Sequence, residues 1–155
     1  MQVKELGHLV LYVRDIAAST HFYRDVLGWT PLFNGLEAAM PMPVAAFNAP
    51  SGRTHHELLL IEVGESAAPI PAGRRVGLYH FGLKVGESDD ELREALAVLR
   101  ANDVHVVGST DHGMTHSLYI TDPDGNEIEL YVDVPGVDWN DPALWTDVRP
   151  KPLRL

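Results

Sequence analysis

Two histidines occupy matching places in a repeated segment of the sequence. His8 lies in the run from Leu6 to Val13, and His80 lies in the run from Leu78 to Val85, 72 positions later. Each run is mostly apolar, so each predicts a largely buried strand. A repeat of this length can fold twice into the same supersecondary unit and bring equivalent positions together about an approximate two-fold axis. The two histidines are therefore candidate metal ligands, whereas a lone buried histidine is more often structural.

A carboxylate on a nearby strand would complete such a site and balance part of the charge of the metal ion. Glu129 meets this requirement because it alternates with Ile128 and Leu130 and therefore faces away from them. Glu127 points to the same face as Glu129, so the strand alone does not choose between the two acids.

The elements that must position these residues follow a repeated order. The first repeat, about residues 5–63, predicts a strand at 5–13, a helix at 16–27 with Asp15 as its N-cap, and strands near 29–33, 42–48 and 55–63. A Gly-, Ser-, Ala- and Pro-rich loop at 64–77 leads to the second repeat, about residues 78–133.

The second repeat begins with a strand at 78–85 and a helix that Ser88 and Glu91 open as a capping box. Three more strands are predicted at 103–108, 117–121 and 127–133, the last one after the turn at 122–126. The expected fold is α+β: two βαβββ repeats in a single domain, residues 1–133, that form a cupped mixed sheet around a metal site. Residues 134–155 form a Pro- and Trp-containing tail, which we expect to pack on its own domain or on a second subunit.

Composition narrows the function. The chain of 155 residues has no cysteine, which excludes thiolate chemistry and zinc-finger sites, and its net charge of −10 would repel nucleic acid. No apolar run is long enough to span a membrane, and the first residues lack the features of a signal peptide. We therefore expect a cytoplasmic protein without nucleic-acid or membrane partners.

The βαβββ repeats with His8, His80 and Glu129 resemble the vicinal oxygen chelate superfamily, which includes glyoxalase I, bleomycin and fosfomycin resistance proteins and extradiol dioxygenases. The resemblance covers nearly all of residues 5–133. It implies a divalent metal ion bound by these three residues, two histidines and one carboxylate on one face, as in non-haem iron(II) oxygenases.

A second motif is more specific. The run from Thr110 to Glu129 resembles the signature of type I extradiol, catechol 2,3-dioxygenase-like enzymes, which joins a histidine, a Leu-Tyr pair, an acidic-Pro-x-Gly turn and the ligand glutamate. By this resemblance His112 and Tyr119 assist catalysis, and His56 is the acid/base histidine. The implied reaction is cleavage of a small aromatic diol with O2, with iron(II) as the expected metal and manganese(II), nickel(II) or zinc(II) as alternatives. Because a single pair of repeats leaves few loops to close the pocket, we expect a homodimer or the Pro-rich tail to complete it.

Two other functions stay open. Glu57 lies 72 positions before Glu129, the same offset as His8 to His80, so a glyoxalase I-like isomerase or lyase would use His8, Glu57, His80 and Glu129 as four ligands. Whether residue 56 or residue 57 faces the metal is undecided in the sequence. The third hypothesis is a small-molecule binding or drug resistance protein of this fold that performs no catalysis.

Overall fold

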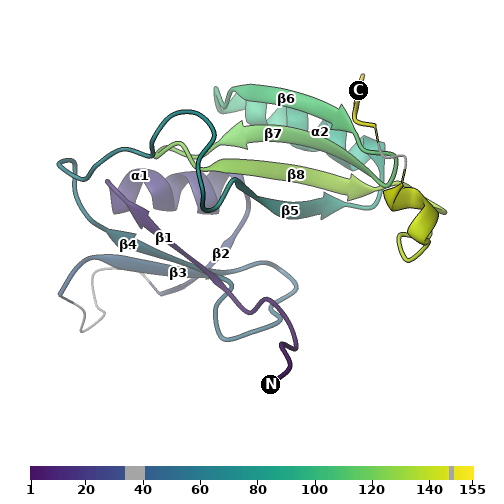
Figure 1. The fold of residues 1–155 in the computed structure, drawn as a ribbon. Coiled ribbons are helices and arrows are strands. Elements are labelled where there is room, and N and C mark those ends of the chain that lie inside the picture. Colours follow the sequence, from purple (N-terminus) through teal and green to yellow (C-terminus); the bar gives the residue numbers. More distant parts are fainter. Residues whose placement is uncertain (34–40, 147–148) are drawn as a thin grey trace. The chain divides into compact units, whose positions relative to one another are not determined.

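The computed structural model describes residues 1–33, 41–146 and 149–155, and the chain divides into two compact units, Met1–Ile70 and Pro71–Leu155. Each unit contains a strand, a helix and three further strands, to which unit 2 adds a short fifth strand, and the strands of each unit build one mixed sheet (Figure 1). The predicted α+β class and the βαβββ repeat are therefore confirmed. In the described part of the chain, no helix has the length and apolar character needed to cross a membrane.

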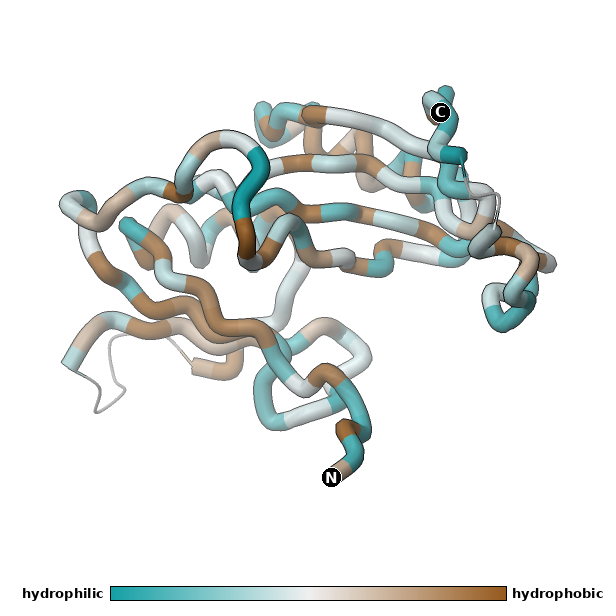
Figure 2. The backbone as a smooth tube through the Cα atoms, in the orientation of Figure 1, coloured by the Kyte–Doolittle hydropathy of each residue, from teal (hydrophilic) through white to brown (hydrophobic). Residues whose placement is uncertain are grey.

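Unit 1 forms a four-stranded sheet of order β1-β4-β3-β2, in which only the β1 and β4 pair is parallel. Its elements are β1 (Leu9–Val13), α1 (Ile16–His21), the π-helical turn η1 (Phe22–Val26), β2 (Thr30–Phe33), β3 (Val44–Asn48) and β4 (Leu58–Glu62). The carboxylate of Asp15 accepts hydrogen bonds from the N–H groups of Ala17 and Ala18, which confirms the predicted N-cap. Much of β1, β3 and β4 is hydrophobic, and these strands supply the core of the unit together with Phe22 and Tyr23 of η1 (Figure 2).

Unit 2 forms a five-stranded sheet of order β5-β8-β7-β6-β9, in which β5 and β8 are parallel and the other pairs antiparallel. Its elements are β5 (His80–Gly86), α2 (Asp89–Ala101), β6 (Val106–Asp111), β7 (Thr115–Thr121), β8 (Glu127–Asp133), the 3-10 turn η2 (Pro142–Trp145) and β9 (Lys151–Pro152). Helix α2 packs against β5, β7 and β8.

The two faces of β8 differ in polarity. Every second residue of β8 is apolar and buried: Ile128, Leu130 and Val132. Helix α2 contributes the buried residues Leu92 and Leu99 to the same unit. The carboxylates that alternate with the apolar residues of β8, Glu127 and Glu129, are only partly buried because successive side chains of a strand point to opposite faces. The open face of the sheet of unit 2 therefore carries the acidic residues.

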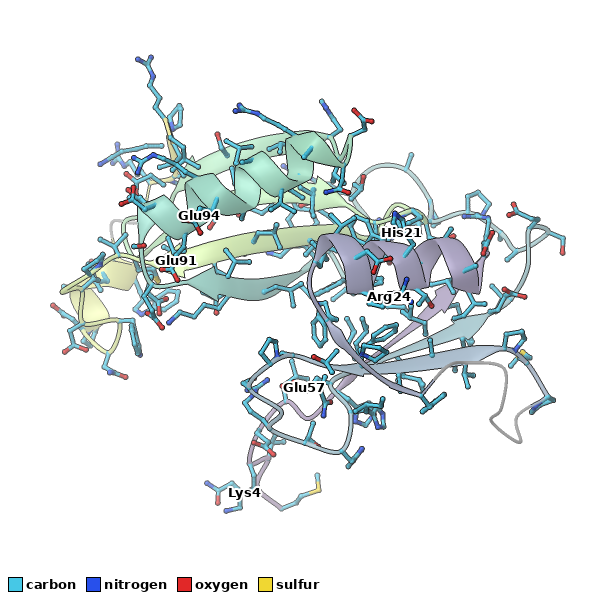
Figure 3. All side chains as sticks on the ribbon, turned by 180° about the vertical axis from the view of Figure 1, so that it is seen from behind. Lys4, His21, Arg24, Glu57, Glu91 and Glu94 are labelled. Atoms are coloured by element: carbon cyan, nitrogen blue, oxygen red, sulfur yellow. The ribbon has the colours of Figure 1, made fainter. Side chains whose placement is uncertain are left out.

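A capping box opens α2, as the sequence predicts. The hydroxyl of Ser88 accepts a hydrogen bond from the N–H of Glu91, and Oε2 of Glu91 accepts from the N–H of Glu87 at 2.7 Å. Glu91 lies at the start of the helix (Figure 3). A Cβ atom at position 86 would lie 2.6 Å from the Glu91 side chain, so Gly86 leaves the space that the capping carboxylate needs.

The turn before β8 is held by one buried acid. Asp122 is 5% exposed, and its carboxylate accepts hydrogen bonds from the N–H groups of Asp124 and Asn126 and from the Asn126 amide. Gly125 has a φ of 90°, which few other residues adopt. This turn fixes where β8 begins and hence where Glu129 lies.

The C-terminal tail packs on unit 2 through β9, which pairs with β6 by Thr110 with Pro152 and Asp111 with Lys151. Residues 147–148 of the tail lie outside the described residues. The strand predicted at 103–108 is misplaced, since β6 runs from Val106 to Asp111. Strands β7 and β9 both pair with β6 as far as Asp111, which extends β6 beyond its predicted end. The sequence pattern of one strand does not reveal how far its pairing partners extend.

Candidate active site

Glu129 is the centre of a polar cluster in unit 2. Its side chain is 16% exposed, and Tyr119 lies directly opposite it in the β7 and β8 pair. Oε1 of Glu129 accepts hydrogen bonds from the Ser117 hydroxyl at 2.6 Å and from the Tyr119 hydroxyl at 3.2 Å. Both donors therefore engage the same oxygen, and Oε2 is left facing elsewhere.

His80 lies beside that second oxygen. Its Nε2 atom is 3.3 Å from Oε2 of Glu129, and its Nδ1 atom is 3.6 Å from Oε1 of Glu127. Gly82 pairs with Glu129 in the β5 and β8 ladder, and a Cβ atom there would meet Tyr131 at 3.3 Å and Glu129 Oε2 at 3.8 Å. The absence of a side chain at position 82 thus leaves the space around the Glu129 carboxylate open.

His112 and Tyr119 form the next part of the cluster. Nε2 of His112 lies 2.8 Å from the Tyr119 hydroxyl and 3.8 Å from Oε1 of Glu129. Because a tyrosine has one hydroxyl hydrogen, donation from Tyr119 to Glu129 makes Nε2–H of His112 the donor to Tyr119. Burial and then the negative charge of Glu129 raise the pKa of Tyr119 well above its usual range. The three residues form a continuous hydrogen-bonded chain.

In unit 1 three imidazoles gather just before the strands. His8 precedes β1, and its ring centroid lies 4.6 Å from that of His56 and 5.9 Å from that of His55. The Nδ1 atoms of His55 and His56 are 2.6 Å apart, so one ring donates to the other. Burial, followed by the nearby His55 and His8 rings, lowers the pKa of His56.

Glu57 faces other donors within unit 1. Its side chain is 5% exposed, and it accepts hydrogen bonds from Nε of Arg53 and from the N–H of Ala49, both at 2.9 Å. Figure 3 shows Glu57 where the chain approaches the sheet of this unit. Of the two neighbours that the sequence left undecided, His56 is therefore the one beside His8, and Glu57 is held by an ion pair.

The strand registers also separate Glu57 from Glu129. Gly82 pairs with Glu129 in unit 2, whereas the residue that corresponds to Gly82 by the repeat offset, Val10, pairs with Leu59 in unit 1. The counterpart of Glu129 is thus Leu59, which has no ligating atom. Glu57 and Glu129 are 72 positions apart in the sequence, as His8 and His80 are, but the two glutamates do not occupy equivalent positions in the two sheets.

The donor atoms of unit 2 suit a divalent metal ion. Two ligands about 2.1 Å from one ion and at right angles lie roughly 3 Å apart, close to the 3.3 Å between His80 Nε2 and Glu129 Oε2. Ser117 and Tyr119 hold the other carboxylate oxygen, as partners of ligands in metal sites do. Within the described residues, no three His, Asp or Glu side chains group closely enough to hold a metal ion by themselves. The ligand set drawn from His8, His80 and Glu129 stays a prediction.

Four of the six residues singled out in the sequence, His80, His112, Tyr119 and Glu129, meet in unit 2, and the other two, His8 and His56, meet in unit 1. Sequence reasoning missed Ser117 and Gly82. Ser117 lies two residues before Tyr119 on the same face of β7, so strand alternation around the signature tyrosine is the signal that could have found it.

Residues 5–130 match the family described as the Glyoxalase/Bleomycin resistance protein/Dioxygenase superfamily, and the chain belongs to that superfamily. It is 34% identical over 134 residues to catechol-2,3-dioxygenase of Bacillus subtilis (strain 168), an alignment that covers 86% of this chain and 43% of that protein. It is 30% identical over 128 residues to biphenyl-2,3-diol 1,2-dioxygenase 3 of Rhodococcus globerulus, which covers 83% of this chain and 63% of that protein.

A solved glyoxylase/bleomycin resistance protein/dioxygenase domain from Frankia sp. EAN1pec has the same fold, with a TM-score of 0.70 at 21% identity, covering 86% of this chain and 100% of that chain. By contrast, the chain spans less than two thirds of the length of each of the two dioxygenases to which it is similar. Its relatives include dioxygenases, and the family name also covers glyoxalases and resistance proteins.

Proposed function

We propose that this protein is a non-haem iron(II) extradiol dioxygenase that cleaves a small catechol-type diol with O2. The observation that carries the proposal is the hydrogen-bonded chain from His112 through Tyr119 to Glu129. It joins three residues of the ring-cleavage signature at one carboxylate, and isomerisation of a hemithioacetal requires neither the histidine nor the tyrosine. The similarity to two diol dioxygenases supports the same reaction class.

In this proposal His8, His80 and Glu129 are the metal ligands, in a two-histidine, one-carboxylate set. Iron(II), when bound, supplies the Lewis acidity that favours the ionised diol and the redox chemistry that O2 requires. The reaction breaks the ring C–C bond beside the diol and places both oxygen atoms of O2 in the product, so it needs no external reductant.

The protein residues supply the proton transfers. His56, the imidazole beside His8, is proposed to take a proton from one hydroxyl of the diol and to return it later in the reaction. His112 and Tyr119 are proposed to donate hydrogen bonds to negative charge that develops on oxygen.

The test is anaerobic loading with iron(II), followed by O2 and a panel of monocyclic and bicyclic catechols. We expect a yellow ring-opened product and an equal uptake of oxygen. A fully iron-loaded protein that turns over no member of the panel contradicts the proposal. Conversion of a hemithioacetal without oxygen uptake would identify the isomerase, and tight ligand binding without turnover of either substrate class would identify a binding protein.

We also propose that the protein is a homodimer. Trp139 and Trp145 of the tail are 55% and 67% exposed in the single chain, and exposed tryptophans of this kind are enriched at protein interfaces. Sedimentation equilibrium should give twice the chain mass of 17.1 kDa. A concentration-independent monomer contradicts this expectation.

A further inference from the structure

The two ring nitrogens of His80 face different carboxylates. Nε2 lies beside Glu129, as described above, whereas Nδ1 is buried and has no hydrogen-bond partner among the described residues. The carboxylate beside Nδ1 is that of Glu127, whose Oε1 atom lies 3.6 Å from this nitrogen. A good N–H···O hydrogen bond measures about 2.9 Å, so a small shift of either side chain would close this contact.

The fold holds Glu127 in this place. His80 and Glu127 are direct partners in the parallel pair of β5 and β8, and both side chains are about a quarter exposed, at 26% and 27%. The negative charge of Glu127 also raises the pKa of Tyr79. The ring of Tyr79 lies 4.6 Å from that of His80. The pairing of the two strands therefore places the Glu127 carboxylate beside the His80 ring.

The chemistry of imidazole gives this arrangement a purpose. A neutral imidazole carries one N–H group, and the nitrogen that binds a metal must be the one without the hydrogen. For Nε2 to bind a metal ion through its lone pair, the hydrogen must sit on Nδ1, where it needs an acceptor because buried polar groups are rarely left unpaired. Glu127 is that acceptor by position.

We propose that Glu127 is the positioning residue of His80: it accepts a hydrogen bond from Nδ1–H, fixes the tautomer with Nε2 unprotonated, and so presents Nε2 to a divalent metal ion. The inference rests on the proposed function only in that His80 is taken as a metal ligand. The two acids that the sequence could not distinguish thus have different roles. Glu129 lies beside Nε2, the nitrogen that would bind the metal ion, and Glu127 lies beside Nδ1.

The variants are Glu127→Ala, which removes the acceptor, and Glu127→Gln, which keeps an acceptor oxygen and the shape. Glu94→Ala is the matched control, because Glu94 is an exposed acid on α2 and its loss changes the net charge by the same amount (Figure 3). Thermal melts of all three establish that the variants are folded.

The first measurement needs no metal. Long-range 1H–15N NMR spectra of the metal-free protein report the tautomer of each histidine, and the His80→Gln spectrum identifies the signals of His80. Without a metal ion, Glu129 beside Nε2 competes with Glu127 beside Nδ1 for the imidazole hydrogen. We therefore expect a larger share of the Nδ1–H tautomer in the parent protein and in Glu94→Ala than in Glu127→Ala, where only Glu129 remains. An unchanged tautomer in folded Glu127→Ala overturns the proposal.

The second measurement is the anaerobic affinity for cobalt(II), followed by its visible absorption. Loss of a hydrogen-bond partner of a ligand weakens metal binding about 10- to 100-fold, so Glu127→Ala should fall in this range and Glu127→Gln should recover part of the loss. Equal affinity in the parent and Glu127→Ala contradicts the proposal. If the parent binds no cobalt(II) while the tautomer still shifts, the metal site of the proposed function fails and the positioning of His80 by Glu127 stands.

Discussion

Ser117 and Glu129 lie diagonally across two neighbouring strands, and the buried Ser117 hydroxyl donates a 2.6 Å hydrogen bond to Oε1 of Glu129. Together with Tyr119, this donor occupies one carboxylate oxygen and turns the other toward His80. The orientation of the carboxylate is thus determined by β7, a strand that contributes none of the proposed ligands. This relationship gives the first prediction.

Ser117→Ala should weaken cobalt(II) binding roughly 10-fold. It should also lower the free energy of unfolding by about 1–2 kcal/mol, because a buried hydrogen bond to a charged group is lost. Ser109→Ala is the control, since the Ser109 hydroxyl donates to the Leu153 carbonyl in the tail and not to the site. Isothermal titration and urea denaturation measure the two effects. A full-strength site in Ser117→Ala would show that Tyr119 alone orients Glu129.

When saturated with iron(II), His112→Phe and Tyr119→Phe should lose turnover by roughly 100- to 10,000-fold, the usual contribution of a positioned acid or base. Tyr119→Phe should also bind the metal roughly 10-fold more weakly, because it removes one of the two hydrogen bonds to Glu129. The expected loss falls on kcat, because neither residue is a proposed ligand. Steady-state oxygen uptake measures turnover, and metal analysis of the same samples measures the bound iron, so a loss of catalysis is distinguished from a loss of metal. Loss of iron from His112→Phe at saturating iron(II) would make His112 part of the metal site.

His8→Ala, His80→Ala and Glu129→Ala should each lose bound metal, since removing one of three ligands leaves a severely weakened site. Glu57→Ala should keep its metal. Its carboxylate holds Ala49 and Arg53, so the expected effect is a loss of about 1–3 kcal/mol in the free energy of unfolding.

Metal content after gel filtration distinguishes these outcomes. Stoichiometric metal in all three ligand variants would mean that the site lies elsewhere. Loss of metal from a folded Glu57→Ala would restore the four-ligand arrangement and the isomerase hypothesis with it.

Ser88→Ala should destabilise the protein by about 1 kcal/mol through the loss of the N-cap of α2. Gly86→Ala should cost at least as much, because its Cβ would meet the Glu91 side chain at 2.6 Å and displace the capping carboxylate. Urea denaturation measures both effects, and Glu94→Ala on the same helix serves as the reference. A Gly86→Ala variant as stable as the parent would show that the cap rearranges without cost.

The sequence predicted best those features that depend on local chemistry. Asp15 and Ser88 cap their helices as expected, and β8 has the predicted bounds because Asp122 and Gly125 form its turn immediately before it. The clustering of His112, Tyr119 and Glu129 was predictable because their spacing matches a known signature.

The remaining features depend on residues distant in the chain. Strand β6 was misplaced by three residues because its pairing partners include β9 in the tail. The role of Glu57 depends on Arg53 and Ala49, which no strand pattern identifies as its partners. Ser117 was overlooked because a serine in a strand carries no chemical signal until the side chain across from it is known.

The registers of the two sheets differ by two residues: Leu9 pairs with Leu58, 49 positions later, and Phe81 pairs with Ile128, 47 positions later. An even difference keeps every side chain of β8 on its own face of the pleated sheet. A slip of one residue in the pairing of β8 would instead turn Ile128, Leu130 and Val132 outward and bring Glu129 into the apolar layer. The two units can therefore differ in register by two residues while each keeps one apolar face for its core, whereas an odd difference would exchange the two faces of the strand.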